Sequence, residues 1–134
     1  MLFFIPGISE RKRLLVVDDD DFFLSVTTGV LKDTYEVIPV KSGKEALDYM
    51  LQGPAPDLIL LDIMMPNMDG WETFNKIRAI SFMRNIPVVF LTSLNEENDE
   101  KRAQEIGAAD FIKKPYEKND LLKRIEKILS NKTP

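Results

Sequence analysis

Residues 56–70, PDLILLDIMMPNMDG, decide the fold of this 134-residue chain. Their centre, Leu58–Leu61, is an uninterrupted apolar run, which is typical of a strand that is covered on both faces. The run ends at Asp62, and apolar residues recur at helical spacing after the pair Asp69-Gly70. A buried strand followed by an amphipathic helix predicts a β-α unit, from which parallel sheets are built.

The same alternation recurs along the chain and predicts five β-α units. We expect strands at Leu14–Val17, Tyr35–Val40, Leu58–Leu61, Pro87–Leu91 and Phe111–Ile112. We expect helices over residues 23–31, 44–51, 71–77, 96–105 and 121–129, where apolar side chains fall on one helical face. This order predicts an α/β fold with a parallel sheet, helices on both of its faces and right-handed crossovers.

Two of these elements carry a further expectation. The strand that contains Pro39 is expected at an edge of the sheet, because proline cannot donate a hydrogen bond to a neighbouring strand. The helix over residues 96–105 has a thin apolar face, with Ala103 and Ile106 as its main anchors. Gly107 is expected to terminate that helix.

The chain's length and composition predict one domain, which we place at residues 13–130, between an N-terminal extension of residues 1–12 and a short tail of residues 131–134.

Cysteine and histidine are both absent, which excludes disulfides, thiolate metal sites and the usual general base near neutral pH. Any chemistry must therefore use carboxylates, lysines, hydroxyls or a hard cation. The net charge of −4 and the lack of a basic stripe or long apolar run argue against nucleic-acid and membrane binding, and we expect a cytoplasmic protein.

Polar residues follow four of the predicted strands, at the edge where parallel sheets bind ligands. They are Asp18 to Asp21 after the first strand, Asp62 after the third, Thr92-Ser93 after the fourth and Lys113-Lys114-Pro115 after the fifth. Converging carboxylates need a cation, and an all-oxygen site favours Mg²⁺, whose open positions phosphoryl oxygens complete. A hydroxyl and an ammonium nearby suit the remaining phosphoryl oxygens. This set predicts a site for a phosphoryl group held by Mg²⁺.

Each of these signals also has a simpler interpretation when it is taken alone. A run of aspartates at a strand end is commonly a solvated loop that caps a helix, and Asp62 by itself is a common turn residue. Thr92-Ser93 is ordinarily another cap, and a lysine before proline ordinarily lies in a surface loop. The functional interpretation depends on all four occurring in order, each directly after a predicted strand.

The sequence resembles the receiver domains of two-component response regulators. The stretches that carry the resemblance are LLVVDDDD (14–21), SGKEAL (42–47), PDLILLDIMMPNMDG (56–70), IPVVFLTS (86–93) and GAADFIKKPY (107–116). The most specific element combines Asp62, Pro66 and Asp69-Gly70 with the late Lys114-Pro115. The resemblance implies the flavodoxin-like (βα)₅ fold with strand order 2-1-3-4-5.

The resemblance also implies a role for each site residue. It implies that Asp62 is the phosphoacceptor and that Thr92 and Lys114 contact the phosphoryl oxygens. It also implies that Asp19 binds Mg²⁺ directly, with Asp18 beside it, and that the backbone carbonyl of Met64 is a third protein ligand. Thr92 and Phe111 are expected to act as the switch pair, with the Phe111 ring turning inward on activation. Two departures from the common pattern are Asp21, where many family members have proline, and Phe111, which lacks the hydroxyl of the frequent tyrosine.

The expected function is a phosphorylation-activated switch rather than an enzyme. The implied partners are a sensor histidine kinase or histidine phosphotransfer protein as donor and a downstream effector, which contacts the surface at Glu96–Gln104 and around Phe111. A small-molecule phosphotransferase is disfavoured, because no separate general acid or base follows the strands. A flavin carrier would need a phosphate-binding loop where this chain has four aspartates. A receiver that binds proteins without phosphorylation is disfavoured by the complete set Asp19, Asp62, Thr92 and Lys114.

Overall fold

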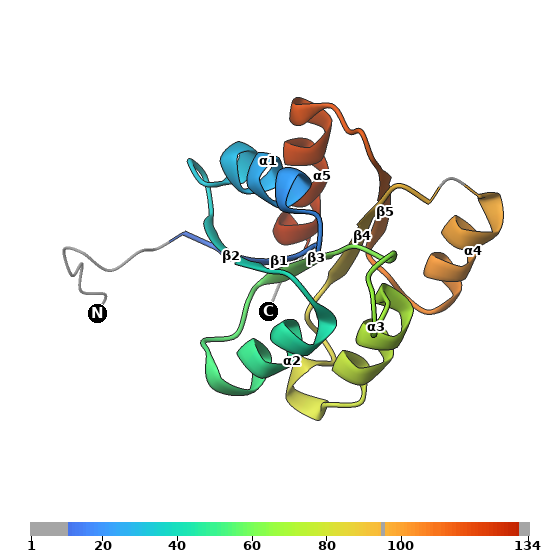
Figure 1. Ribbon diagram of the computed structural model, residues 1–134. Coiled ribbons are helices and arrows are strands. Elements are labelled where there is room, and N and C mark those ends of the chain that lie inside the picture. Colours follow the sequence, from blue (N-terminus) through green and yellow to red (C-terminus); the bar gives the residue numbers. More distant parts are fainter. Residues whose placement is uncertain (1–10, 95, 132–134) are drawn as a thin grey trace.

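The computed structural model describes residues 11–94 and 96–131 and contains a five-stranded parallel sheet (Figure 1). In chain order its elements are β1 (Arg13–Val17), α1 (Asp21–Leu31), β2 (Glu36–Val40), α2 (Gly43–Gln52), β3 (Leu58–Leu61), α3 (Gly70–Arg78), the short 3₁₀ helix η1 (Ser81–Met83), β4 (Val88–Thr92), α4 (Glu97–Glu105), β5 (Asp110–Lys113) and α5 (Lys118–Ser130). The strand order is β2-β1-β3-β4-β5, which confirms the predicted doubly wound, flavodoxin-like fold.

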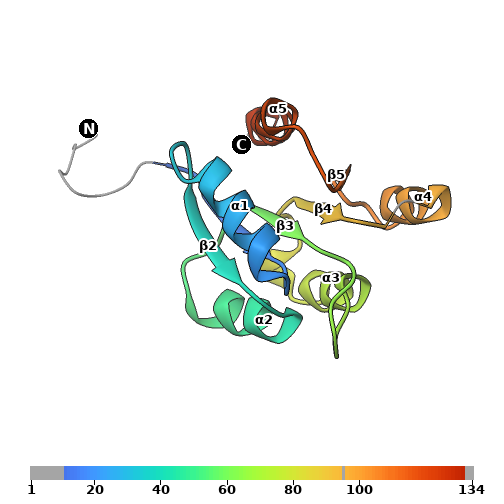
Figure 2. The same cartoon turned by 45° about the horizontal axis from the view of Figure 1, so that its top comes forward.

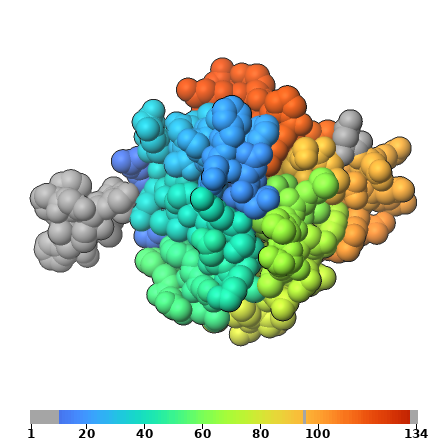
Figure 3. Space-filling model, viewed as in Figure 1, coloured from blue at the N-terminus to red at the C-terminus, as the bar shows by residue number. Residues whose placement is uncertain are grey.

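The helices form two layers, one on each face of the sheet. Helices α1 and α5 cover one face, and α2, α3 and α4 cover the other (Figures 1 and 2). In the space-filling view α1 and α5 lie above α2 and α3 (Figure 3). Each layer has its own core: Leu24 and Leu121 pack in the first, and Met50, Phe74 and Ala103 in the second. The central strand β3 is buried along its whole length, as its apolar run predicted.

Several element boundaries differ from the sequence-based expectation by a residue or two. Strand β4 runs on to Thr92, which pairs with Lys113 of β5, so both residues end strands rather than follow them. Strand β2 begins at Glu36 instead of Tyr35. The expectation for Pro39 is confirmed: β2 is an edge strand, and Pro39 is exposed there.

Short polar residues set the helix starts at the carboxyl edge of the sheet. The Asp20 side chain accepts hydrogen bonds from the amides of Phe22 and Phe23 and so caps α1. Asp20, one of the four consecutive aspartates, therefore caps a helix, which is the simpler role that such a run commonly has. The predicted stop at Gly107 is also confirmed, since this residue has a φ of 90°, a left-handed conformation that glycine adopts without strain.

The expected extension and tail lie largely outside the described residues, namely at 1–10 and 132–134. Where the description begins, the Arg11 guanidinium donates a hydrogen bond of 2.6 Å to the carbonyl of Lys32. No helix within residues 11–94 and 96–131 has the length and apolar character needed to cross a membrane.

Candidate functional site

The parallel ladders bring the polar strand ends together at one edge of the sheet. The backbone amide of Asp62 donates to the carbonyl of Val17 at 2.9 Å, which places Asp62 beside the start of the aspartate run. The amide of Lys114 donates to the carbonyl of Thr92 at 2.8 Å, which places the lysine beside the end of β4. These four strand ends are the ones that the sequence predicted would converge.

Three carboxylates form the acidic part of the site. Asp18, Asp19 and Asp62 each offer an oxygen, and these atoms lie within 4.8 Å of one another. Asp18 and Asp62 are buried, whereas Asp19 is exposed and leaves the cluster open on its side. Hard oxygen donors without nitrogen or sulfur suit a cation such as Mg²⁺, so this set fits the predicted metal.

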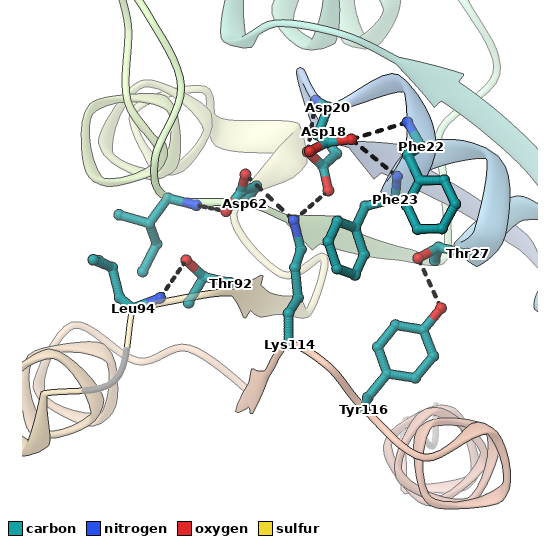
Figure 4. Close-up of polar contacts among 11 residues, drawn as sticks. Asp18, Asp20, Phe22, Phe23, Thr27, Asp62, Thr92, Leu94, Lys114 and Tyr116 are labelled. Atoms are coloured by element: carbon teal, nitrogen blue, oxygen red, sulfur yellow. Dashed lines mark hydrogen bonds and ion pairs between the residues drawn. The ribbon is translucent and has the colours of Figure 1, made fainter.

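Lys114 supplies the positive charge of the site. Its Nζ lies 2.5 Å from Oδ2 of Asp18 and 3.5 Å from Oδ2 of Asp62 (Figure 4). The lysine side chain is only 5% exposed, so these ion pairs are shielded from water. An ammonium between two buried carboxylates offsets part of their mutual repulsion, and it lies where an anionic group on Asp62 would need a counter-charge.

The fold raises the proton affinity of the Asp62 carboxylate. The pKa of Asp62 is raised from 3.8 to about 6, and burial is the largest cause; the Lys114 ammonium acts in the opposite direction, and the negative charge of Asp18 adds to the rise. Interaction with the Thr92 hydroxyl and the 2.8 Å hydrogen bond from the Ile63 amide favour the ionised form and lower this pKa. Asp62 is therefore ionised at neutral pH, but its charge is poorly compensated.

This raised pKa predicts a pH-dependent stability when divalent cations are absent. The folded chain holds the Asp62 proton more tightly than the unfolded chain, so ionising Asp62 lowers the free energy of unfolding as the pH rises from about 4 through about 6. We expect Asp62→Asn to remove this penalty and to stabilise the chain above pH 7 by on the order of 2–3 kcal/mol. The advantage should shrink toward zero near pH 4.

Urea unfolding at a series of pH values, with a chelator present, measures this difference. Exposed Asp33 offers a matched control, and Asp33→Asn should leave the wild-type curve unchanged. An Asp62→Asn chain that is no more stable than wild type at pH 7.5 would contradict the cause given for the shift.

The expected switch residues lie on neighbouring strands. Thr92 ends β4 with a fully buried side chain, and its hydroxyl accepts a hydrogen bond of 3.3 Å from the amide of Leu94. Phe111 pairs with Phe90 across β4 and β5, and its ring is buried in the layer that α2, α3 and α4 cover. The ring is 6% exposed, and its movement on activation remains a prediction.

The glycine that ends the motif beginning at Asp62 is required for a steric reason. A Cβ atom on Gly70 would lie 2.3 Å from the carbonyl oxygen of Asp62, so only glycine lets α3 start this close to the end of β3. The amide of Gly70 donates to the carbonyl of Ile63 at 2.8 Å, and Asp69 caps the helix through the amide of Glu72. These contacts fix the loop that contains Asp62.

Met64, the predicted backbone ligand, lies in that loop with 58% of its surface exposed. Its side chain lines an open pocket of about 500 Å³ beside the site, together with Ile63, Met65, Asp69, Trp71 and Leu94. Coordination by the Met64 carbonyl remains a prediction.

Sequence reasoning missed three residues near Lys114. Phe23 and Thr27 lie within the predicted helix over residues 23–31 without a predicted role in the site, and Tyr116 has no predicted role either. In the structure the Phe23 ring lies against the Lys114 ammonium, and the Thr27 and Tyr116 hydroxyls share a hydrogen bond of 2.9 Å (Figure 4). The one signal available in the sequence was a tyrosine directly after Lys114-Pro115.

Comparisons with known proteins agree with this geometry. The family model described as "Response regulator receiver domain" matches residues 14–126. The chain is 34% identical over 118 residues to the "Two-component response regulator ORR5" of Oryza sativa subsp. japonica, an alignment that covers 87% of this chain and 88% of that protein. A crystal structure described as a putative response regulator from Chloroflexus aurantiacus J-10-fl superposes with a TM-score of 0.84 at 31% identity, covering 90% of this chain and 99% of that one.

Other relatives are longer than this chain. It is 38% identical over 119 residues to a "Probable cyclic di-GMP phosphodiesterase" of Vibrio cholerae, an alignment that covers 89% of this chain but 27% of that protein. It spans about half of a Bacillus subtilis transcriptional regulator of alkaline phosphatase synthesis. The similarity is therefore to one part of these proteins.

Proposed function

The chain belongs to the response regulator receiver domain family of two-component signalling systems, and on this premise we propose that it is a switch activated by phosphorylation of Asp62. The observation that supports this most strongly is the buried Lys114 ammonium between the Asp18 and Asp62 carboxylates, with Asp19 exposed beside them. Receiver domains are regulatory, and this one would assist only its own phosphorylation and dephosphorylation. Incorporation of one phosphoryl group per chain from a small donor in the presence of Mg²⁺ tests the proposal.

The reaction is an in-line transfer to a carboxylate. An oxygen of ionised Asp62 attacks the phosphorus of a phosphohistidine, the P–N bond breaks, and its electron pair leaves with the donor's imidazole, which is then protonated by solvent. Burial keeps the attacking carboxylate poorly hydrated, and the hydrogen bond from the Ile63 amide helps to fix its orientation. The main tasks of the chain are positioning and charge stabilisation.

Asp18, Asp19 and Asp62 would hold Mg²⁺, together with the backbone carbonyl of Met64. When bound, the ion offsets the repulsion between the attacking carboxylate and the anionic phosphoryl group. Lys114 would donate to a phosphoryl oxygen from the other side of Asp62, exchanging its contact with the carboxylate for one with the new group. The Thr92 hydroxyl would then leave the Leu94 amide and donate to a second phosphoryl oxygen.

The output surface would be the one formed by α4, β5 and the start of α5. Helix α4 is the least firmly docked of the α-helices on its face: all of its residues are described, and Ala103 is its one buried side chain. Arg102 lies over the Trp71 ring at 4.1 Å and adds a contact that water can reach. A helix with one buried anchor is easily shifted when Thr92 and Phe111 move beside it.

We expect a phosphoryl mimic to change amide hydrogen exchange in α4 and around Phe111. Beryllofluoride added with Mg²⁺ should alter protection over Glu97–Glu105 by about tenfold or more, because the docking of this helix depends on few contacts. Helix α2, Gly43–Gln52, is the internal control and should remain unchanged. A response confined to α2, with α4 silent, would refute the proposed output surface.

The phosphorylated chain is expected to be fairly long-lived. Met64 and Leu94 line the pocket beside Asp62, and neither apolar side chain can orient an attacking water by hydrogen bonding. We expect Met64→Asn combined with Leu94→Glu to speed the loss of phosphate by about tenfold. Decay of phosphorylated protein after removal of the donor measures this, and a double variant with unchanged or slower decay would contradict it.

The partners would be a sensor histidine kinase or a histidine phosphotransfer protein as donor and an effector protein or domain as target. A cytoplasmic site of action follows from this proposed pairing. The alignment covers 54% of the phosphate regulon transcriptional regulatory protein PhoB of Escherichia coli, and this partial coverage supports including an effector domain among the targets.

A further inference from the structure

The Lys114 ammonium has an aromatic neighbour that its ion pairs do not explain. The centroid of the Phe23 ring lies 4.6 Å from Nζ, within the range of a cation–π interaction. Figure 4 shows the lysine stem rising between Asp62 and this ring. Phe23 lies in the first turn of α1 and is half-buried, so the attraction acts in a partly desolvated setting.

A second contact joins the same face of α1 to the backbone beyond Lys114. The hydroxyls of Thr27 and Tyr116 share a hydrogen bond of 2.9 Å. Thr27 is 1% exposed and lies one helical turn after Phe23, so both side chains leave α1 on the same side. Tyr116 is two residues beyond Lys114. Helix α1 therefore contacts both the charged end of the lysine and the segment that holds its backbone.

Lysine needs such support because its ammonium is a compact charge on a flexible four-carbon stem. Here the ammonium lies nearer to Asp18 than to Asp62, at 2.5 Å against 3.5 Å. With these two ion pairs alone, the ammonium would stay with the nearer carboxylate, Asp18, and move away from Asp62. The Phe23 ring occupies another side of Nζ and restricts how far the ammonium can withdraw from Asp62. The Thr27–Tyr116 hydrogen bond restricts the chain that carries it.

We propose that Phe23, through its ring face, and Thr27, through its hydrogen bond to Tyr116, are positioning residues that hold the Lys114 ammonium where it stabilises phosphoryl transfer to Asp62. This inference rests on the proposed function of Asp62. It requires the aromatic face and the hydroxyl themselves, and apolar bulk at either position does not replace them.

The test compares substitutions that keep shape with substitutions that keep chemistry. Phe23→Leu and Thr27→Val retain apolar volume but remove the ring face and the hydroxyl, while Phe23→Tyr and Thr27→Ser retain them. With acetyl phosphate and Mg²⁺, we expect the initial rate of phosphorylation to fall on the order of tenfold in the first pair. The second pair should stay within about twofold of wild type.

Two controls match these changes in chemistry. Phe82→Leu makes the same phenylalanine-to-leucine change at an exposed ring in η1, which precedes β4 and so lies at the opposite end of the strands. Thr34→Val makes the same threonine-to-valine change at an exposed site. Both should phosphorylate at the wild-type rate, and thermal unfolding of every variant identifies any that do not fold. Since Thr27→Val is nearly isosteric, it keeps the test valid if Phe23→Leu is poorly folded.

The outcomes separate this inference from the proposed function. A wild-type chain that takes up no phosphoryl group overturns the proposed function and, with it, the role of α1. A phosphorylated wild type with Phe23→Leu and Thr27→Val at the same rate overturns the positioning role alone. Equal losses in Phe23→Tyr and Phe23→Leu, or in Thr27→Ser and Thr27→Val, would show a packing role and also overturn it.

Discussion

Asp62→Asn is expected to reduce phosphorylation of the chain to background while leaving a folded protein. An amide cannot act as the nucleophile that the reaction needs, and the substitution also removes one of the three clustered carboxylates. The fold should persist, because Lys114 keeps its ion pair with Asp18 and the charge removed is one that burial disfavours.

Intact-mass spectrometry after incubation with acetyl phosphate and Mg²⁺ measures the loss. Asp33→Asn, which makes the same change at an exposed position, should accept phosphate as wild type does. If Asp62→Asn took up one phosphoryl group at the wild-type rate, the nucleophile would be another residue and the proposed function of Asp62 would be wrong.

Asp19→Asn is expected to weaken Mg²⁺ binding by at least about 10- to 100-fold, because it removes a full negative charge from an all-oxygen site. Asp19 is exposed, so the loss is electrostatic and involves no rearrangement of the core. Phosphorylation at low Mg²⁺ should fall in parallel and recover at high concentrations of the ion.

Metal titration followed by Trp71 fluorescence reports this affinity, since the ring lines the pocket next to Met64 and Asp69. Asp20→Asn is the matched control: it removes a neighbouring charge, and asparagine caps α1 as well as aspartate does. An Asp19→Asn chain with wild-type affinity would mean that the cation binds elsewhere.

The fold was predictable because its strands are buried on both faces and read as apolar runs. Leu58–Leu61 was assigned with its observed bounds for this reason. The end of β4 was missed because apolar periodicity stops at Leu91, whereas the ladder continues to Thr92, a β-branched residue that suits a strand. The strand order came from the family resemblance, since patterns of single segments carry no information on which strands pair.

The residues that meet at the site could be predicted from the sequence, but the pKa of Asp62 and the long-range contacts beside it could not. Strand ends place Asp18, Asp62 and Lys114 at one edge by topology alone. The raised pKa of Asp62 depends on how far the surrounding layers exclude water, which sequence does not encode locally. The Thr27–Tyr116 hydrogen bond joins residues 89 positions apart and could not be inferred from either segment.

The account depends on Asp62 being the residue that accepts phosphate, and chemical mapping of the phosphorylated chain tests this most directly. Borohydride reduces an acyl phosphate to an alcohol, so treatment after phosphorylation should convert Asp62 to homoserine, and peptide mass spectrometry locates the change. The account predicts homoserine at position 62 and at no other aspartate. Conversion at a different carboxylate, or phosphate that survives reduction as an ester on a hydroxyl residue, would contradict it.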